Sequence, residues 1–493
     1  MLARNVAVLA YAVRGRVLLK YYGKLSLSLV GLTGVGLLPA LLERDWDMAG
    51  RLAAVTAALA LGGWLLSRLR VPAHIQANEA LVVVVAVFAT GALALMWPFQ
   101  GAGLGWADAL FEAVSAVTTT GLSTLASVEG HSPTFLFLRA WAQWYGGLVI
   151  VVLALALLLE PGGAAKRITE VEGAQEDLVG STRLRAQRLL AVYGLLTAAG
   201  LAVLLAAGAR PFDALLHALA AVSTGGFSNY DASLAGLGGW PVQAATTALC
   251  LTGAISLTLY YRAWQEGWRR RGWRRLWGDT ELRLLLVCAL GVALLLAATM
   301  AWSGRYGWAD IAAHAPLLAV SAQTTAGFAT LNVGDLDAAS KLVMIVAMFV
   351  GGDMGSTAGG IKVLRLLVLL RLTHGVVVRT SLPRHAVMEL RLGGERMPVE
   401  AVLAAVTVVA LYALVVAGSW LVFLAAGAEP LASLFDVVSA VGTVGLSAGA
   451  VTPHLATGLK LLLCLDMLLG RLEVVAVLVV ISPFTWFGRK ERS

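Results

Sequence analysis

One short motif occurs four times in this sequence and contains the residues best suited to chemistry, which would be the binding of a dehydrated cation. Each copy has an Ala, a Thr three residues later, a Gly two residues after the Thr, and then a large apolar residue. Gly adopts backbone angles that other residues avoid, and a potassium filter is a ring of four loops whose carbonyl oxygens replace the water shell of the ion. The candidate ion-binding triplets are Thr119-Thr120-Gly121, Thr224-Gly225-Gly226, Thr325-Ala326-Gly327 and Thr443-Val444-Gly445.

The regular spacing of the four copies distinguishes them from ordinary packing residues. Gly and Thr are common in membrane helices, where they allow close packing, and a single copy would mean no more than that. The four glycines are 105, 101 and 118 residues apart, so the motif recurs about every hundred residues. The last copy also begins the Thr-Val-Gly signature of potassium filters. The sequence therefore predicts four similar units with fourfold pseudosymmetry.

Each motif follows a short, partly apolar segment that would hold it in place. These segments are shorter than the roughly 20 residues that cross about 30 Å of hydrocarbon, which is typical of re-entrant helices. Three begin with a turn residue and an acid, Asp108, Asp213 or Asp310, and we expect these acids to cap the helices. The C-terminal end of each helix dipole would then favour a cation at the filter. The predicted pore helices are Trp106–Val117, Pro211–Val222, Trp308–Ala322 and Pro430–Val441.

Long apolar stretches on either side of the pore helices predict the membrane spans. They cover 25–43 and 52–67 before the first motif, then 79–97 and 135–159, 187–207 and 240–261, 282–302 and 340–371, and 400–426 and 457–481. The expected fold is an all-α polytopic membrane protein, with four pseudo-repeats of helix, pore loop and helix around a central ion pore. Its units are an N-terminal amphipathic segment and two-helix hairpin (1–72) and four pore repeats (73–165, 166–276, 277–390, 391–493), the third with an intramembrane gating loop and the fourth with the C-terminal tail.

The composition agrees with a chain that lies mainly in lipid, since 59% of the residues are apolar and 13% are charged. The net charge of +8 comes from basic residues in alternate loops. The positive-inside rule explains these without a nucleic-acid partner. It predicts a multi-pass protein of the cytoplasmic (inner) cell membrane with both termini cytoplasmic and the filter loops entering from outside. The three cysteines lie in apolar stretches and imply neither a disulfide nor a metal cluster, and no cleaved signal peptide is expected.

A glycine-rich stretch interrupts the predicted span at 340–371. It contains Gly351, Gly352, Asp353, Gly355, Gly359, Gly360 and Lys362. Glycines disfavour a helix interior by about 1 kcal/mol each, and irregular backbone at membrane depth requires protein or water to satisfy it. A phosphate-binding loop is disfavoured because Lys362 comes one place late and no Ser or Thr follows it. We expect a break below the filter that bends across the ion path, with a simple packing kink as the alternative.

Arg471 is a charged residue inside the last apolar span. Such a charge costs at least roughly 2.5–3.5 kcal/mol on insertion scales, so it normally faces water or a partner. Two interpretations remain open from the residues alone. Arg471 either lies in the ion path or forms a structural ion pair with Asp466 or Glu473.

With the four motifs, the glycine-rich stretch and the sequence Leu469-Gly470-Arg471-Leu472-Glu473, the chain resembles the Trk/Ktr/HKT potassium transporter superfamily over about residues 79–481. The hairpin resembles that of the Trk-type branch. The resemblance implies K⁺ uptake through the filter, gating by the glycine-rich loop, and Arg471 as an electrostatic barrier. It implies no enzymatic activity and no cofactor in this chain. It also implies a homodimer with a cytoplasmic nucleotide-binding regulatory subunit docked on the basic face.

The sequence departs from the family pattern in two places. Asp353 and Met354 stand where small or polar residues are usual, and we expect Asp353 to form a closed-state latch with Arg471 or Lys362. The fourth motif, preceded by Gly442, resembles the Ktr branch. All four key filter positions are Gly, whereas a Ser at the first is associated in the family with Na⁺ transport, so K⁺ is favoured.

Three alternative functions remain. The first is a Na⁺- or cation-coupled symporter of the same family. The second is a broken-helix secondary carrier, which would have two inverted halves rather than four parallel repeats. The third is a membrane enzyme, which would need a cluster of His, Asp or Cys that the sequence does not contain.

Other polar residues are assigned supporting roles. His217 and His314 lie on predicted pore helices without a metal-ligand spacing. We expect Glu112 and Asp436 to hold filter loops. The Arg- and Trp-rich stretch 262–275 is interpreted as an anchor at the membrane interface.

Overall fold

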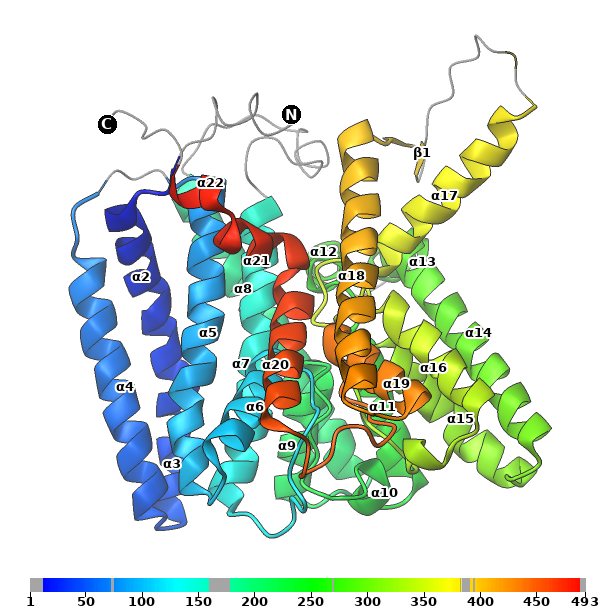
Figure 1. The fold of residues 1–493 in the computed structure, drawn as a ribbon, viewed down its shortest axis with the longest axis horizontal. Coiled ribbons are helices and arrows are strands. Elements are labelled where there is room, and N and C mark those ends of the chain that lie inside the picture. The colour runs from blue at the N-terminus through cyan, green and yellow to red at the C-terminus, as the bar shows by residue number, and fades with distance from the viewer. Residues whose placement is uncertain are drawn as a thin grey trace.

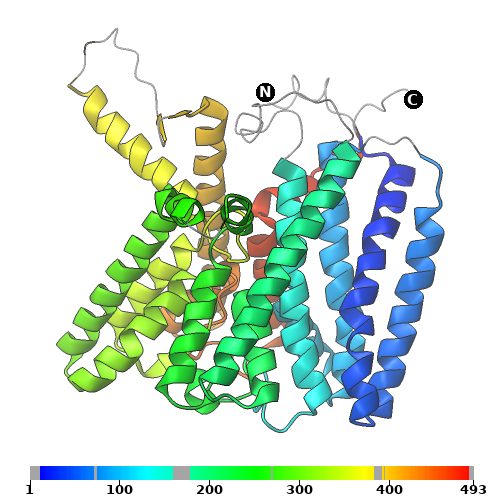
Figure 2. The same cartoon turned by 180° about the vertical axis from the view of Figure 1, so that it is seen from behind.

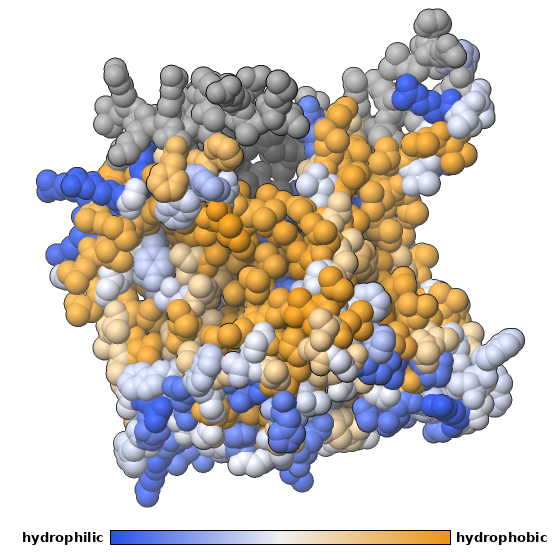
Figure 3. Space-filling view, in the orientation of Figure 1, coloured by the Kyte–Doolittle hydropathy of each residue, from blue (hydrophilic) through white to orange (hydrophobic). Residues whose placement is uncertain are grey.

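The computed structural model describes residues 12–71, 75–158, 178–267, 270–381, 383, 391–392 and 395–487. Within these residues the elements are helices, apart from a two-residue hairpin of β1 (Arg391–Leu392) and β2 (Glu395–Arg396). The long helices stand side by side (Figure 1). A broad apolar band covers the surface in the same orientation, with hydrophilic residues gathered along its lower edge (Figure 3). The expected all-α, multi-pass architecture is confirmed.

The first helices form the expected hairpin, α2 (Gly15–Gly34) and α4 (Trp46–Ser67), joined by the short α3 (Leu37–Leu42). Helix α2 begins ten residues before the predicted start of the first span. The two helices can approach closely because a Cβ added at Gly23 would lie 2.5 Å from the Cβ of Leu66. The hydroxyls of Thr33 and Thr56 are 2.8 Å apart across the same crossing. Figure 2 shows this hairpin at one edge of the molecule, opposite the helices of the third predicted repeat.

The remaining helices follow the predicted order of long helix, pore helix and second helix. The first group is α5 (Ala77–Gly101), α6 (Trp106–Val117) and α7 (Pro133–Leu158); the second is α8 (Leu178–Ala206), α9 (Pro211–Val222), α11 (Trp240–Gly253) and α12 (Leu257–Gln265); the third is α14 (Thr280–Ser303), α15 (Trp308–Gln323), α16 (Ala338–Val350) and α17 (Val363–Arg379); the fourth is α18 (Val399–Ala425), α19 (Pro430–Val441), α20 (Thr457–Leu472) and α21 (Val474–Ile481). Shorter elements are α10 (Leu234–Leu237), α13 (Arg270–Gly278), the 3₁₀ helix η2 (Val333–Asp335) and α22 (Pro483–Trp486).

Ten spans were predicted with one break, in 340–371; the structure has that break and two further ones. In the described part of the chain, seven helices are long and apolar enough to cross a membrane, or eight if α11 and α12 count as one span bent by 84°. Helices α16 and α17 are separated by residues 351–362, and α20 and α21 by Glu473, whose φ is 61°. All three breaks fall in second helices. At the first two breaks, groups from other repeats replace the missing helical hydrogen bonds: Asp353 donates to the carbonyl of Ala254, and Gly360 donates to that of Gly442.

The two ends of the described chain meet. The backbone N–H of Val13 donates to the carbonyl oxygen of Thr485 at 2.9 Å, so α2 begins where α22 ends. The terminal segments to which the orientation prediction refers, 1–11 and 488–493, lie outside the described residues.

Candidate ion pathway

The repeated motif makes the same turn at the end of each pore helix. The four motif threonines, Thr119, Thr224, Thr325 and Thr443, have left-handed φ values of 55°, 51°, 54° and 50°. Each donates its backbone N–H to the carbonyl of the motif Ala three residues earlier, at 3.0–3.2 Å. The next residue donates to the carbonyl five residues earlier, at 2.8–2.9 Å. A left-handed Thr is uncommon and strained, so four of them indicate a backbone that is held in place.

The four turns form a closed ring. Each filter glycine has a positive φ, and a Cβ added to it would collide with the carbonyl oxygen of the middle residue in the next triplet. These contacts run from Gly121 to Gly225, Gly226 to Ala326, Gly327 to Val444, and Gly445 to Thr120. The fourth contact returns to the first triplet. The backbone of all four triplets therefore surrounds one axis.

A cavity of about 400 Å³ lies on one side of this ring. Its lining includes Gly121, Gly226, Gly327 and Gly445 together with the loops that follow them. It leads to the ring from the side opposite the C-terminal ends of the pore helices. An ion reaching the ring would pass through it.

The glycine-rich residues 351–362 lie against the opposite side of the ring. Gly359 donates its N–H to the hydroxyl of Thr325 at 2.7 Å, and Gly360 donates to the carbonyl of Gly442 at 3.1 Å. The hydroxyl of Thr357 is 3.1 Å from the carbonyl of Val222. A Cβ added at Gly359 would collide with the carbonyl of Gly442 and the hydroxyl of Thr443. The segment thus contacts three of the four pore-helix ends directly, and glycine is required for the approach.

Arg471 completes this layer from the last turn of α20, with 5% of its surface exposed. Its Nη1 donates to the carbonyl of Thr357 at 2.7 Å, and its Nη2 lies 3.5 Å from the carbonyl of Gly146 on α7. The acids proposed as partners are engaged elsewhere: Asp466 accepts from Ser419 at 2.8 Å, and Glu473 pairs with Arg365 at 2.6 Å. The structural ion-pair alternative is therefore wrong in this conformation. Arg471 contacts backbone carbonyls beneath the ring.

The expected latch between Asp353 and Arg471 or Lys362 is not formed. Asp353 is fully buried, and neither carboxylate oxygen has a hydrogen-bond partner among the described residues. Lys362, whose φ is 77°, turns its ammonium group back to the carbonyl of Ala358. The nearby Glu281 instead accepts the N–H of Met354 at 3.1 Å. Asp353 and Lys362 lie in the segment but do not hold it closed through a mutual charge pair.

The acids at the start of two pore helices do not cap them as expected. Asp108 accepts from the hydroxyl of Thr124 at 2.6 Å and from Lys460 at 2.5 Å. Asp213 accepts from Asn229 and from Tyr230, both at 2.7 Å. The cause is that outer-loop polar groups compete for these carboxylates. Only Asp310 follows the prediction, since it lies 3.3 Å from the N–H of Gly307.

The other polar residues on the pore helices support the loops. Glu112 pairs with Arg139 at 2.9 Å, and Asp436 accepts from Ser447, Ala448 and Val451 at 2.6–2.7 Å. His217 binds the carbonyl of Asp213 and the hydroxyl of Ser228; His314 binds the hydroxyl of Thr330. No group of three potential metal ligands occurs in the described ranges. These contacts agree with a supporting role for all four residues.

Two buried glutamines that the sequence analysis did not select hold the backbone of this region. Gln143 on α7 donates to the carbonyl of Gly225 and accepts the N–H of Phe227 at 3.1 Å. Gln323, the last residue of α15, donates to the carbonyl of Gly351 at 2.9 Å. The equivalent positions in the other pore helices are Val117, Val222 and Val441. An amide side chain within an apolar helix is the signal that would have identified them.

Fold and site together define a multi-pass membrane transport protein whose four re-entrant elements surround a single axis. Comparison with known proteins identifies the family. The family model described as cation transport protein, TrkH, matches residues 52–486. The chain belongs to this family, which confirms the expected superfamily and a transport rather than an enzymatic function.

Individual relatives agree over most of the chain. The Trk system potassium uptake protein TrkH of Halomonas elongata is 32% identical over 408 residues, which is 80% of this chain and 82% of the relative. The protein of the same name from Escherichia coli K12 is 29% identical over 478 residues, covering 94% and 98%. The crystal structure of the potassium transporter TrkH from Vibrio parahaemolyticus superposes with a TM-score of 0.86 at 27% identity, covering 96% of this chain and all of that chain.

Proposed function

We propose that this chain carries K⁺ into the cell through the ring formed by its four motif triplets. The closed sequence of contacts from Gly121 through Gly226 and Gly327 to Gly445 carries this proposal. It brings the carbonyls of four loops around one axis, which is the arrangement that replaces the hydration shell of K⁺. The printed names of the relatives, potassium uptake proteins, support the choice of ion.

The gate consists of the glycine-rich segment and Arg471. The segment lies against the inner side of the ring, and its closest approach depends on Gly359. Arg471 places a guanidinium beside it and binds Thr357. A cation leaving the ring meets both the backbone obstruction and the positive charge, so opening requires them to move together.

The test is rubidium uptake into proteoliposomes with K⁺, Na⁺ or Li⁺ as competitor, comparing the wild type with Gly445→Ser. The new side chain would crowd the carbonyl of Thr120, so we expect weaker discrimination between K⁺ and Na⁺. Gly449→Ser is the matched control. Gly449 also has a positive φ, of 103°, but no heavy atom lies within 4 Å of an added Cβ. The Gly449→Ser substitution therefore imposes backbone strain without crowding the ring.

Unchanged selectivity in Gly445→Ser, or an equal loss in Gly449→Ser, would contradict the filter assignment. A Na⁺-coupled symporter of the same family is distinguished in the same vesicles by an imposed Na⁺ gradient. Uptake that rises with that gradient would indicate cotransport with Na⁺ instead of uncoupled K⁺ flux.

The cavity beside the ring faces the outside in this proposal, and the end with α12, α13 and α22 faces the cytoplasm of the inner-membrane protein. The arginines of α13 make that end basic, which supports docking of a nucleotide-binding regulatory subunit on a homodimer. The orientation is tested with single cysteines at Gly449 and Gln265 and an impermeant thiol reagent in intact cells. Labelling at Gln265→Cys but not at Gly449→Cys would reverse it. Sedimentation with and without the candidate subunit tests the assembly.

A further inference from the structure

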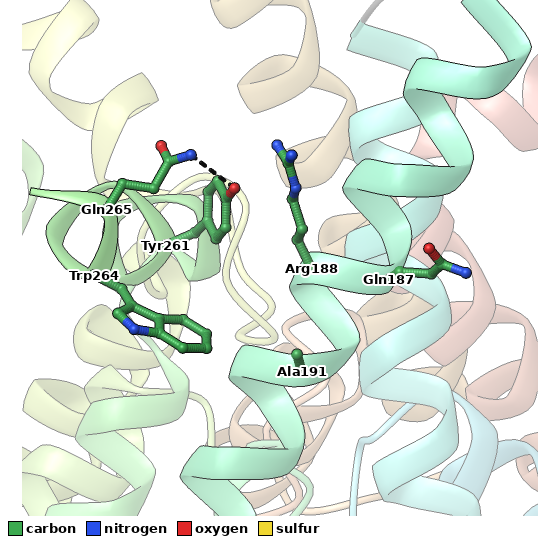
Figure 4. Close-up of a pocket in the computed structure, with 6 residues that line it drawn as sticks. All are labelled: Gln187, Arg188, Ala191, Tyr261, Trp264 and Gln265. Carbon is green, nitrogen blue, oxygen red and sulfur yellow. Dashed lines mark hydrogen bonds between the residues drawn. The ribbon is translucent and has the colours of Figure 1, made fainter.

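A cleft lies between residues 187–191 of α8 and the short helix α12, away from the ion pathway. Its volume is about 400 Å³, and it is lined by Gln187, Arg188 and Ala191 from α8 and by Tyr261, Trp264 and Gln265 from α12. Arg188 and the hydrogen-bonded pair of Tyr261 and Gln265 lie on facing sides of the cleft, and Trp264 borders it below them (Figure 4). None of these residues takes part in the proposed filter or gate.

Arg188 supplies a guanidinium that donates to no acceptor among the described residues. Its guanidinium carbon is 5.3 Å from the centroid of the Tyr261 ring, and in the described part of the chain no carboxylate lies within 4 Å of it. Glu266, the acid that follows the cleft residues on α12, is paired with Arg275 at 2.6 Å. A planar guanidinium held by an aromatic ring is suited to bind a phosphate through two parallel hydrogen bonds.

Ala191 and Trp264 form an apolar side of the cleft, which continues along exposed apolar residues. Leu195 follows Ala191 by four residues on the same face of α8 and is 52% exposed. Trp264 on α12 and Trp273 and Trp277 on α13 are 45%, 53% and 55% exposed. Tryptophans are enriched at the level of lipid head groups. The cleft therefore has a positive end at the interface and an apolar end in the hydrocarbon, which matches one amphiphile rather than a small soluble anion.

We propose that this cleft binds an anionic phospholipid of the surrounding bilayer, with its phosphate on Arg188 and an acyl chain along Ala191 and Leu195. Arg271 and Arg274 lie in α13, the helix that follows α12, and raise the local concentration of anionic lipid. Arg188 selects the head group, and Trp264 packs beside the glycerol backbone.

The lipid would stabilise the docked position of α12, which is joined to the glycine-rich segment. Leu257, the first residue of α12, donates its N–H to the carbonyl of Gly355 at 3.2 Å. The break before α12 also receives Asp353, whose N–H donates to the carbonyl of Ala254 at 3.0 Å. Lipid occupancy would thereby bias the position of the segment. This second step rests on the proposed gating function, whereas lipid binding does not.

The experiment measures lipid retention by the delipidated full-length chain, using native mass spectrometry with phosphatidylglycerol and phosphatidylcholine added in equal amounts. The wild type should retain phosphatidylglycerol preferentially. Arg188→Gln should reduce that preference about tenfold, the expected loss of one charge-assisted contact. Arg188→Lys keeps the charge and should recover part of it. Arg262→Gln is the matched control, since Arg262 is an exposed arginine of α12, the helix on the other side of the cleft, and does not line the cleft.

Three results would overturn the proposal. Equal losses in Arg188→Gln and Arg262→Gln would mean general surface attraction. Displacement of the lipid by inorganic phosphate would mean a site for free anions. Preferential lipid retention that appears only after Glu170, Glu172, Glu176 and Asp177 are neutralised would mean that an acidic stretch of this chain occupies the cleft. None of these measurements involves ion flux. Their outcome therefore tests lipid binding independently of the proposed filter.

Discussion

The Nη1 atom of Arg471 lies 2.7 Å from the carbonyl oxygen of Thr357, so the buried charge is bonded to the segment beneath the ring. Nη2 of the same side chain reaches Gly146 on α7. One residue thus links the last predicted repeat, the first repeat and the glycine-rich segment. Its charge and its hydrogen bonds can be separated by substitution.

Replacing Arg471 with Gln should speed rubidium uptake by removing both the charge and the tether. For a cation that passes about 8 Å from the guanidinium, the repulsion between the two charges is about 2 kcal/mol at an effective dielectric constant of 20. Removing this repulsion would raise the uptake rate by at most roughly 30-fold. Arg471→Lys should give a smaller increase, because it keeps the charge. Arg371→Gln is the control at an exposed arginine of α17, and an equal effect there would argue against a barrier at Arg471.

Gly359→Ala should push the segment away from the ring. The added Cβ would meet the carbonyl of Gly442 and the hydroxyl of Thr443, while the φ of Gly359 is one that Ala tolerates. We expect faster uptake and a lower melting temperature. Gly355→Ala is the control. Gly355 has a φ of 78°, which Ala rarely adopts, but the atom nearest to an added Cβ is the hydroxyl oxygen of Ser256 at 3.2 Å. If both variants behave alike, backbone strain rather than contact with the ring is responsible.

The two buried glutamines should have separable effects. Gln143→Leu removes support from the carbonyl of Gly225 and should weaken K⁺ over Na⁺ discrimination. Gln323→Val removes the bond to Gly351 and should change the uptake rate at unchanged selectivity. Competition assays and initial rates on both variants measure this. A selectivity loss in Gln323→Val would show that the segment and the ring are not independent.

Asp353→Asn should stabilise the protein. Its carboxylate is buried and accepts no hydrogen bond within the described part of the chain. Burying such a group costs roughly 1–3 kcal/mol, and the neutral amide reduces this cost. The melting temperature should rise while uptake changes little. Combined with Arg471→Gln, the effects should add, because the two side chains do not touch. A strong interaction between the two substitutions would restore the latch hypothesis for another conformation.

The outer loops should be sensitive to acid through Asp231. Partial burial raises its pKa, but hydrogen bonds from the N–H of Val128 and the hydroxyl of Ser127 outweigh this and lower the pKa below the usual 3.8. A depressed pKa contributes stability that is present above the unfolded pKa and is lost as pH falls through the folded one. The melting temperature of the wild type should therefore fall more steeply below about pH 4 than that of Asp231→Asn. Parallel curves would exclude this contribution.

The filter turns could be predicted because their determinants are local. The motif Ala provides the carbonyl that accepts the Thr N–H, and the Gly provides the positive φ, so four copies fold alike. The stretch 240–261 was interpreted as one span, although Gly253 and Ser256 flank its 84° bend. Its freed carbonyls at Gly253 and Ala254 are satisfied by Thr357 and Asp353, about a hundred residues later in the chain.

Charge partners were also beyond local analysis. Arg471 was assigned either to the ion path or to a nearby acid, and the structure gives it two backbone carbonyls from distant segments. The acids at the pore-helix starts match a capping pattern, yet Lys460, which binds Asp108, comes 352 residues later. A local sequence pattern predicts the contacts that a residue makes within its own helix. Arg471, Asp108 and Lys460 instead contact distant segments of the chain.

The ring closes within a single polypeptide, from Gly445 back to Thr120, and this changes what one mutation can do. In an assembly of four identical subunits, every codon change would alter four positions at once. Here each triplet and its pore helix have their own codons. One pore helix can therefore end in a glutamine, Gln323, where the other three have Val117, Val222 and Val441. The gene can therefore alter one side of the ring while the remaining sides keep the backbone turn that all four share.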